Sequence, residues 1–144
     1  MAIGITPDYG FVSLVLFLTF LLNLHMGFRV VAARKKYNVP YPSLYAVESE
    51  NKNTKLFNCV QRGHQNFLEF LPLFLSFLLV GGLKHPKLAA GLGVGHLVAR
   101  YFYFKGYSTG DPENRLKIGG SHFLFLFGLI GCSLSFSISL LMDR

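Results

Sequence analysis

The sequence predicts an all-α membrane protein, a bundle of four transmembrane helices in up-down order. Of its 144 residues, 51% are hydrophobic and only 15% are charged. Its mean hydropathy of +0.41 is too high for an ordinary soluble domain of this length. No charged side chain interrupts the stretch between Asp8 and Arg29 or that between Lys117 and Asp143. Each stretch reaches the roughly 20 residues that span a bilayer, and backbone groups in lipid must pair within a helix.

The remaining chain supplies two further helices, so that a single integral membrane domain covers residues 1–144. The predicted helices cover approximately residues 8–33, 56–82, 87–107 and 116–142. The two middle helices contain charged side chains, which we expect near one end or facing other protein. The short connection "GGLKHP" predicts that these two helices form an antiparallel hairpin. Gly91 and Gly95 form a GxxxG pair, which favours the close approach of another backbone.

The basic residues follow the predicted membrane topology. A net charge of +7 would also suit a nucleic-acid partner, but the cations gather around two loops. Those around the first loop are Arg29, Arg34, Lys35, Lys36, Lys52 and Lys55, and those around the third are Lys105, Arg115 and Lys117. The positive-inside rule then places both loops in the cytosol and both termini outside it. We therefore expect a membrane partner and no nucleic acid.

The two cysteines give no sign of a disulfide or a metal site. Cys59 and Cys132 fall within predicted spans, without the spacing of metal ligands. Small buried side chains are the simpler interpretation, and no metal is expected.

Polar residues gather on one side of the second predicted helix. Arg62, Asn66 and Glu69 have i, i+4, i+7 spacing, which places them within an arc of roughly 60°. Arg62 and His64 could simply extend toward the headgroups. Glu69 lies two turns further along the helix, where an unpaired carboxylate would be costly. This pattern favours a functional site.

The third predicted helix has a matching face near its cytosolic end. Arg100, Tyr103 and Tyr107 are spaced i, i+3, i+7. Interfacial tyrosines alone would indicate only an aromatic belt. Here, however, two helices of one hairpin bring polar faces to the same depth. Such a pocket suits a zwitterionic or polyanionic ligand, which arginines, a carboxylate and hydroxyls can bind together.

Four segments of the chain are distinctive: "ARKKYNVPYP", "FNCVQRGHQNFLEFLPLF", "ARYFYFKGY" and "STGDPENR". They resemble the MAPEG family of membrane-associated proteins in eicosanoid and glutathione metabolism, and its glutathione transferases in particular. The resemblance implies a homotrimer of four-helix subunits, with glutathione bound as co-substrate between neighbouring subunits near the cytosolic face. It also implies the endoplasmic reticulum membrane as the location, with the outer mitochondrial membrane as an alternative.

The resemblance also implies roles for individual residues. The positions matching the family's glutathione ligands are Arg34, Arg62, His64, Asn66, Glu69, Tyr103 and Tyr107. The arginine that activates the thiol matches Arg115, and a second catalytic arginine matches Lys35. Two departures stand out. Phe70 replaces a tyrosine and cannot donate a hydrogen bond, and Lys35 lacks the planar fork of a guanidinium.

The implied activity is ionisation of the glutathione thiol for attack on a lipophilic substrate from the membrane. That substrate would be a lipid hydroperoxide, which is reduced, or an electrophile such as leukotriene A4, which is conjugated. The alternative is a non-catalytic lipid-binding scaffold, as in the family's 5-lipoxygenase-activating member. A small channel fits less well, because the polar residues end after about two helical turns.

Overall fold

The computed structural model describes residues 4–142 as four long helices and two short 3-10 helices. The long helices are α1 (Tyr9–Tyr37), α2 (Thr54–Lys84), α3 (Pro86–Tyr107) and α4 (His122–Met142). The short ones, η1 (Pro112–Leu116) and η2 (Gly119–Ser121), connect α3 to α4. Residues 1–3 and 143–144 of the predicted domain lie outside the described residues.

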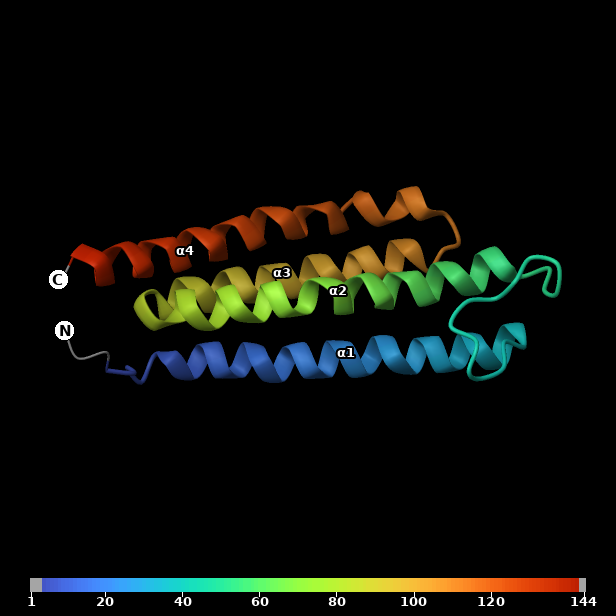
Figure 1. The fold of residues 1–144 in the computed structure, drawn as a ribbon, viewed down its shortest axis with the longest axis horizontal. Helices are drawn as coiled ribbons and strands as arrows, with labels where there is room; N and C mark the ends of the chain where they lie inside the picture. The colour runs from blue at the N-terminus through green and yellow to red at the C-terminus, as the bar shows by residue number, and fades with distance from the viewer. Residues whose placement is uncertain (1–3, 143–144) are drawn as a thin grey trace.

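The helices form an elongated bundle in up-down order (Figure 1). α2 and α3 lie side by side as the predicted hairpin, with α1 and α4 on opposite sides of this pair. α1 begins and α4 ends at one end of the bundle. The long first loop and the η1–η2 connection lie at the other end, so the helices hold the two basic loops close together.

Two helix boundaries differ from the sequence prediction. α1 continues beyond residue 33 to Tyr37 and ends at Asn38, whose φ of 55° is a left-handed conformation that asparagine tolerates. α4 begins at His122 rather than near residue 116. In this connection Gly119 packs directly against the backbone of Tyr103, which a continuous run of larger side chains could not do.

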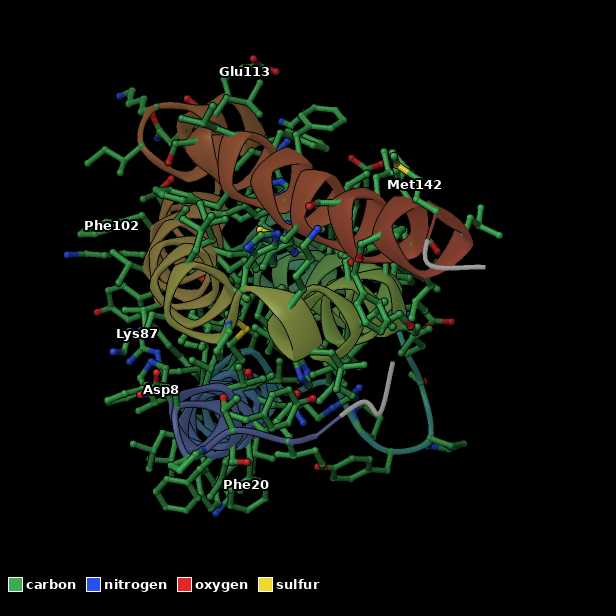
Figure 2. All side chains as sticks on the ribbon, turned by 90° about the vertical axis from the view of Figure 1, so that its left-hand side faces the viewer. Asp8, Phe20, Lys87, Phe102, Glu113 and Met142 are labelled. Atoms are coloured by element: carbon green, nitrogen blue, oxygen red, sulfur yellow. The ribbon has the colours of Figure 1, made fainter. Side chains whose placement is uncertain are left out.

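By length and composition, three of the described helical segments could cross a membrane: α1, α2 and Gly119–Met142. Within each of them, a stretch of 18 residues has a mean hydropathy of 2.0, 1.8 and 2.1, respectively. Their apolar side chains face outward, as Figure 2 shows for Phe20, which is 57% exposed. α3 is less apolar because it carries His96 and Arg100. Both are only 1% exposed and face protein, as expected of polar groups within a membrane bundle.

The close backbone contacts are not where the GxxxG pair predicts them. Within the described chain, Gly91 has no neighbouring atom within 4 Å of a would-be side chain, and Gly95 faces the ring of Phe125. The close approach occurs instead at Gly81 of α2. A Cβ there would lie 2.8 Å from the Cβ of Cys132 and 3.2 Å from the backbone nitrogen of Ser133. Gly81 therefore sets the distance between α2 and α4.

We expect Gly81→Ala to destabilise the bundle by about 1–3 kcal/mol, because α4 must shift to admit the methyl group. Gly91→Ala is the matched control, since it adds the same methyl group in open space. It should be neutral or stabilising, because alanine favours a helix interior by about 0.5–1 kcal/mol over glycine. Thermal unfolding of the two variants and the wild type, followed by circular dichroism in the same detergent, measures both changes in stability. Equal midpoints would contradict this account of the contact.

Candidate functional site

The polar face predicted for α2 exists as a connected group of side chains. Arg62 donates from Nη1 and Nη2 to the two carboxylate oxygens of Glu69, at 2.8 and 3.1 Å. Asn66 donates from Nδ2 to Glu69 Oε2 at 3.4 Å. The side chains of Arg62 and Glu69 are 38% and 45% exposed. An exposed ion pair adds little stability, so this pair contributes little to holding the bundle together.

Asn66 links this exposed pair to the buried guanidinium of Arg100 on α3. Arg100 Nη2 donates to Asn66 Oδ1 at 2.8 Å, and the guanidinium carbon lies 4.5 Å from the ring centre of Tyr103. A buried cation is costly inside a membrane bundle, and its presence there is typical of a functional site.

α4 contributes a residue that the sequence analysis did not assign. His122 is 1% exposed, and its Nε2 lies 3.2 Å from Arg100 Nη1. Within residues 4–142, Arg100 Nε and His122 Nδ1 are buried without a hydrogen-bond partner. The available signal was a histidine at the start of an otherwise apolar helix. α4 therefore takes part in the site as well as supporting the bundle.

The tyrosines and the third connection complete this side of the bundle. The rings of Tyr103 and Tyr107 are 5.9 Å apart, and the Arg115 guanidinium carbon lies 5.5 Å from the centre of the Tyr107 ring. Arg115 is held in η1 by donating from Nη1 to the Pro112 carbonyl at 2.6 Å. A groove of about 390 Å³ runs alongside, lined by Tyr45, Lys55, Asn58, Cys59, Arg62, Tyr107 and Pro112.

Three of the predicted site residues lie elsewhere in the chain. His64 faces α1, where its Nε2 is 2.9 Å from Asn23 Oδ1. Arg34 is buried and donates to the Ser43 carbonyl at 2.6 Å and to Gln61 Oε1 at 3.4 Å. Lys35 is exposed on the last turn of α1. Among residues 4–142, no side-chain hydrogen bond or ion pair links Arg34, Lys35 or His64 to the Arg62 face, the tyrosines or Arg115.

Phe70 of α2 packs against α4. Its ring is edge-on to His122 and Phe123, with ring centres 5.4 and 5.8 Å apart. The Arg100 guanidinium carbon lies 5.4 Å from its centre. Phe70 therefore covers the buried arginine with apolar surface instead of offering a hydroxyl to the groove.

The groove is lined by two cations of α2, Lys55 and Arg62, and by the rings of Tyr45 and Tyr107. The carboxylate of Glu69 pairs with Arg62 beside it. Such a surface can bind a molecule carrying both carboxylates and an ammonium group. Among residues 4–142, no group of three or more His, Cys, Asp or Glu side chains is arranged to hold a metal ion. Cys59 and Cys132 are both buried and unpaired by disulfides.

The sequence matches the profile of the MAPEG family over residues 12–135. It is 31% identical over 117 residues to microsomal glutathione S-transferase 2 of Homo sapiens, covering 78% of this chain and 75% of that protein. It is 35% identical over 110 residues to leukotriene C4 synthase of Rattus norvegicus, covering 76% of this chain and 68% of that protein. For leukotriene C4 synthase of Bos taurus the identity is 32% over 107 residues, covering 74% and 67%. The chain therefore belongs to the MAPEG family.

Proposed function

We propose that the protein is a membrane-embedded enzyme that binds glutathione and activates its thiol against lipophilic substrates. The observation that carries the proposal is the connected group of Arg62, Glu69, Asn66 and Arg100 at the loop end of the α2–α3 pair. It occurs in a chain of the MAPEG family that is similar to proteins named as a glutathione transferase and a leukotriene synthase.

Glutathione has two carboxylates and one ammonium group, which match the charges of the site. Arg62 is exposed enough to pair with a carboxylate of the ligand. Glu69, which now pairs with Arg62, would pair with the ammonium group. Asn66 would be held in place by Arg100, while the hydroxyls of Tyr103 and Tyr107 complete the hydrogen bonds.

Arg115 is the proposed activator of the sulfur. A free cysteine thiol has a pKa of about 8.5, so most glutathione is protonated at neutral pH. A guanidinium beside the sulfur favours the thiolate, and each unit of lowering corresponds to about 1.4 kcal/mol. The thiolate would then attack an epoxide carbon, open the C–O bond and leave an alkoxide that takes up a proton. Lys35 is the proposed proton donor.

A lipid hydroperoxide is the second proposed substrate class. Attack of the thiolate on the outer peroxide oxygen would break the O–O bond and release an alcohol after protonation. A second glutathione would convert the resulting sulfenic acid to a disulfide and water. Both reactions need a water-soluble thiol to meet an oily partner. A polar site at the end of apolar helices is accessible both to the water-soluble thiol and to a lipophilic substrate in the membrane.

We also propose four membrane spans, including α3, and a homotrimer in the endoplasmic reticulum membrane, with the outer mitochondrial membrane as an alternative location. The separation of Arg34, Lys35 and His64 from the Arg62 face supports the trimer. A second copy could bring these three residues to the open side of the first. The proposed glutathione site would then lie between subunits.

Ultraviolet absorbance of the thiolate tests the proposal. Adding glutathione to the assembled, detergent-purified protein should produce a thiolate signal that saturates with one binding constant. The same preparation should consume a lipid hydroperoxide or conjugate a lipophilic epoxide. If neither a thiolate signal nor turnover is detected while the protein still retains a fatty acid, the non-catalytic scaffold replaces the enzyme.

A further inference from the structure

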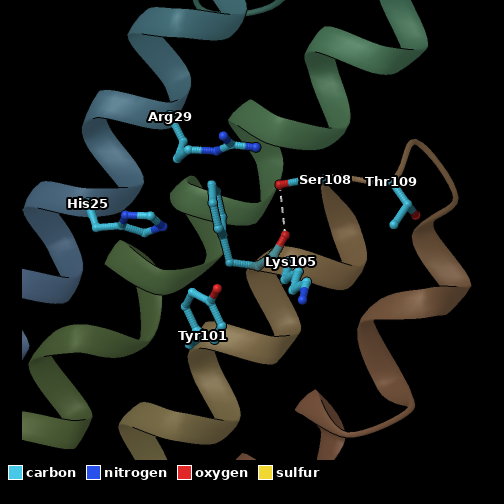
Figure 3. Close-up of a pocket in the computed structure, with 7 residues that line it drawn as sticks. His25, Arg29, Tyr101, Lys105, Ser108 and Thr109 are labelled. Carbon is cyan, nitrogen blue, oxygen red and sulfur yellow. Dashed lines mark hydrogen bonds between the residues drawn. The ribbon is translucent and has the colours of Figure 1, made fainter.

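A second polar pocket lies between α1 and α3 (Figure 3), and neither Arg100 nor Tyr103 is among the residues that line it. Its volume is about 280 Å³. His25 and Arg29 line it from α1, and Tyr101 and Lys105 line it from α3. None of these four side chains belongs to the proposed glutathione site.

The pocket has an excess of positive charge. Neither Arg29 nor Lys105 forms an ion pair within the described part of the chain. Ser108 and Thr109 donate their hydroxyl hydrogens to the carbonyls of Phe104 and Gly106 at 2.8 and 2.7 Å. The same two carbonyls also accept the backbone N–H groups of Ser108 and Thr109, so neither presents an unpaired oxygen to the pocket. The cations of Arg29 and Lys105 are thus available to a negatively charged ligand.

The pocket opens onto apolar helix surface. Phe28 and Val98, beside the polar residues, are 65% and 51% exposed. Further along the same two helices, Leu18 and Val94 help to line an apolar groove of about 410 Å³. Leu18 precedes Arg29 by 11 residues, a distance of about 16 Å along the helix. That is about half of a hydrocarbon core roughly 30 Å thick, which is the depth of one leaflet.

The far end of the α1–α3 groove offers no comparable anion site. There Lys87 lies 3.2 Å from the carboxylate of Asp8, which balances its charge, and Figure 2 shows the two side by side. Lys87 also lines the apolar groove, but its charge is paired, whereas Arg29 and Lys105 at the loop end form no ion pair among residues 4–142. Basic pockets between membrane helices at the cytosolic side commonly bind acidic headgroups.

We propose that the pocket formed by His25, Arg29, Tyr101 and Lys105 binds the phosphate of an anionic membrane lipid, whose acyl chain occupies the α1–α3 groove. This assignment does not depend on glutathione binding and stands apart from the proposed function. A soluble anion would gain nothing from the groove, whereas a phospholipid uses both the charge and the apolar surface.

Native mass spectrometry of the assembled protein tests this with phosphatidylglycerol and with phosphatidylcholine of the same acyl chains. The wild type should prefer phosphatidylglycerol. In Arg29→Gln/Lys105→Gln, affinity for that lipid should fall roughly 30-fold, because each basic side chain contributes a factor of about five. Lys36→Gln/Lys52→Gln removes the same charge elsewhere on the basic side and should leave the preference intact. Lys105→Gln alone, at an exposed position, should lose about fivefold and serves if the double variant does not assemble.

Three results would overturn the proposal. Equal retention of the two lipids would show that the cations select no headgroup. An equal loss in the two double variants would show general attraction rather than a pocket. Displacement of phosphatidylglycerol by inorganic phosphate or oleate as readily as by the lipid itself would assign the pocket to a free anion or a fatty-acid carboxylate.

Discussion

Arg115→Leu should lower turnover roughly 100- to 1,000-fold, the usual effect of removing one group that stabilises a reacting anion. Glutathione binding should weaken only a few-fold, because the proposed role of Arg115 is to ionise the sulfur after binding. The thiolate absorbance should disappear at saturating glutathione. Steady-state kinetics together with calorimetry of glutathione binding separates the two effects.

Lys117→Leu provides the matched control for Arg115→Leu. Lys117 is an exposed cation two residues further along the same connection, and its loss should leave both turnover and the thiolate signal unchanged. Arg115→Lys should retain part of the signal, since it keeps the charge without the planar fork. A full thiolate signal in Arg115→Leu would mean that another group activates the sulfur.

Glu69→Ala should weaken glutathione binding roughly 10- to 100-fold, which corresponds to the loss of about 1.5–3 kcal/mol for a hydrogen bond to a charged group. The variant removes the proposed partner of the ligand's ammonium group. It also releases Arg62 from the bond at 2.8 Å that fixes its position. Turnover at saturating glutathione should fall much less. Calorimetry gives the dissociation constant for glutathione. A titration of turnover against glutathione gives the turnover rate at saturation.

Glu48→Ala is the control for Glu69→Ala, because it removes an exposed carboxylate from the first loop without touching the groove. It should bind glutathione as the wild type does. If Glu69→Ala and Arg115→Leu weaken binding equally, the division of the site into a binding part and an activating part is wrong.

The sequence predicted the helical bundle because hydropathy and charge act through the membrane itself. Uncharged stretches must become helices in lipid, and a connection as short as that before Pro86 leaves only an antiparallel hairpin. The shared face of Arg62, Asn66 and Glu69 followed from helical spacing alone and is confirmed by their hydrogen bonds.

The remaining features depend on contacts between elements distant in sequence. Spacing within α4 gives no sign that His122 reaches Arg100, because that contact depends on how α3 and α4 pack. In the same way, the GxxxG pattern predicts a close contact at Gly91, whereas α4 approaches α2 at Gly81. The sequence around Gly81 gives no sign of this contact. The predicted start of α4 was too early because Gly119 and Gly120, which are poor helix formers, were included in the helix. The close contact of Gly119 with Tyr103 favours a 3-10 turn there.

A structure of the assembled protein determined with glutathione present tests the central claim most directly. The account predicts the tripeptide beside the α2–α3 pair, with its ammonium group at Glu69 and its sulfur directed toward Arg115. Acyl chains packed against Arg62 and Asn66, with glutathione bound elsewhere or not at all, would contradict it.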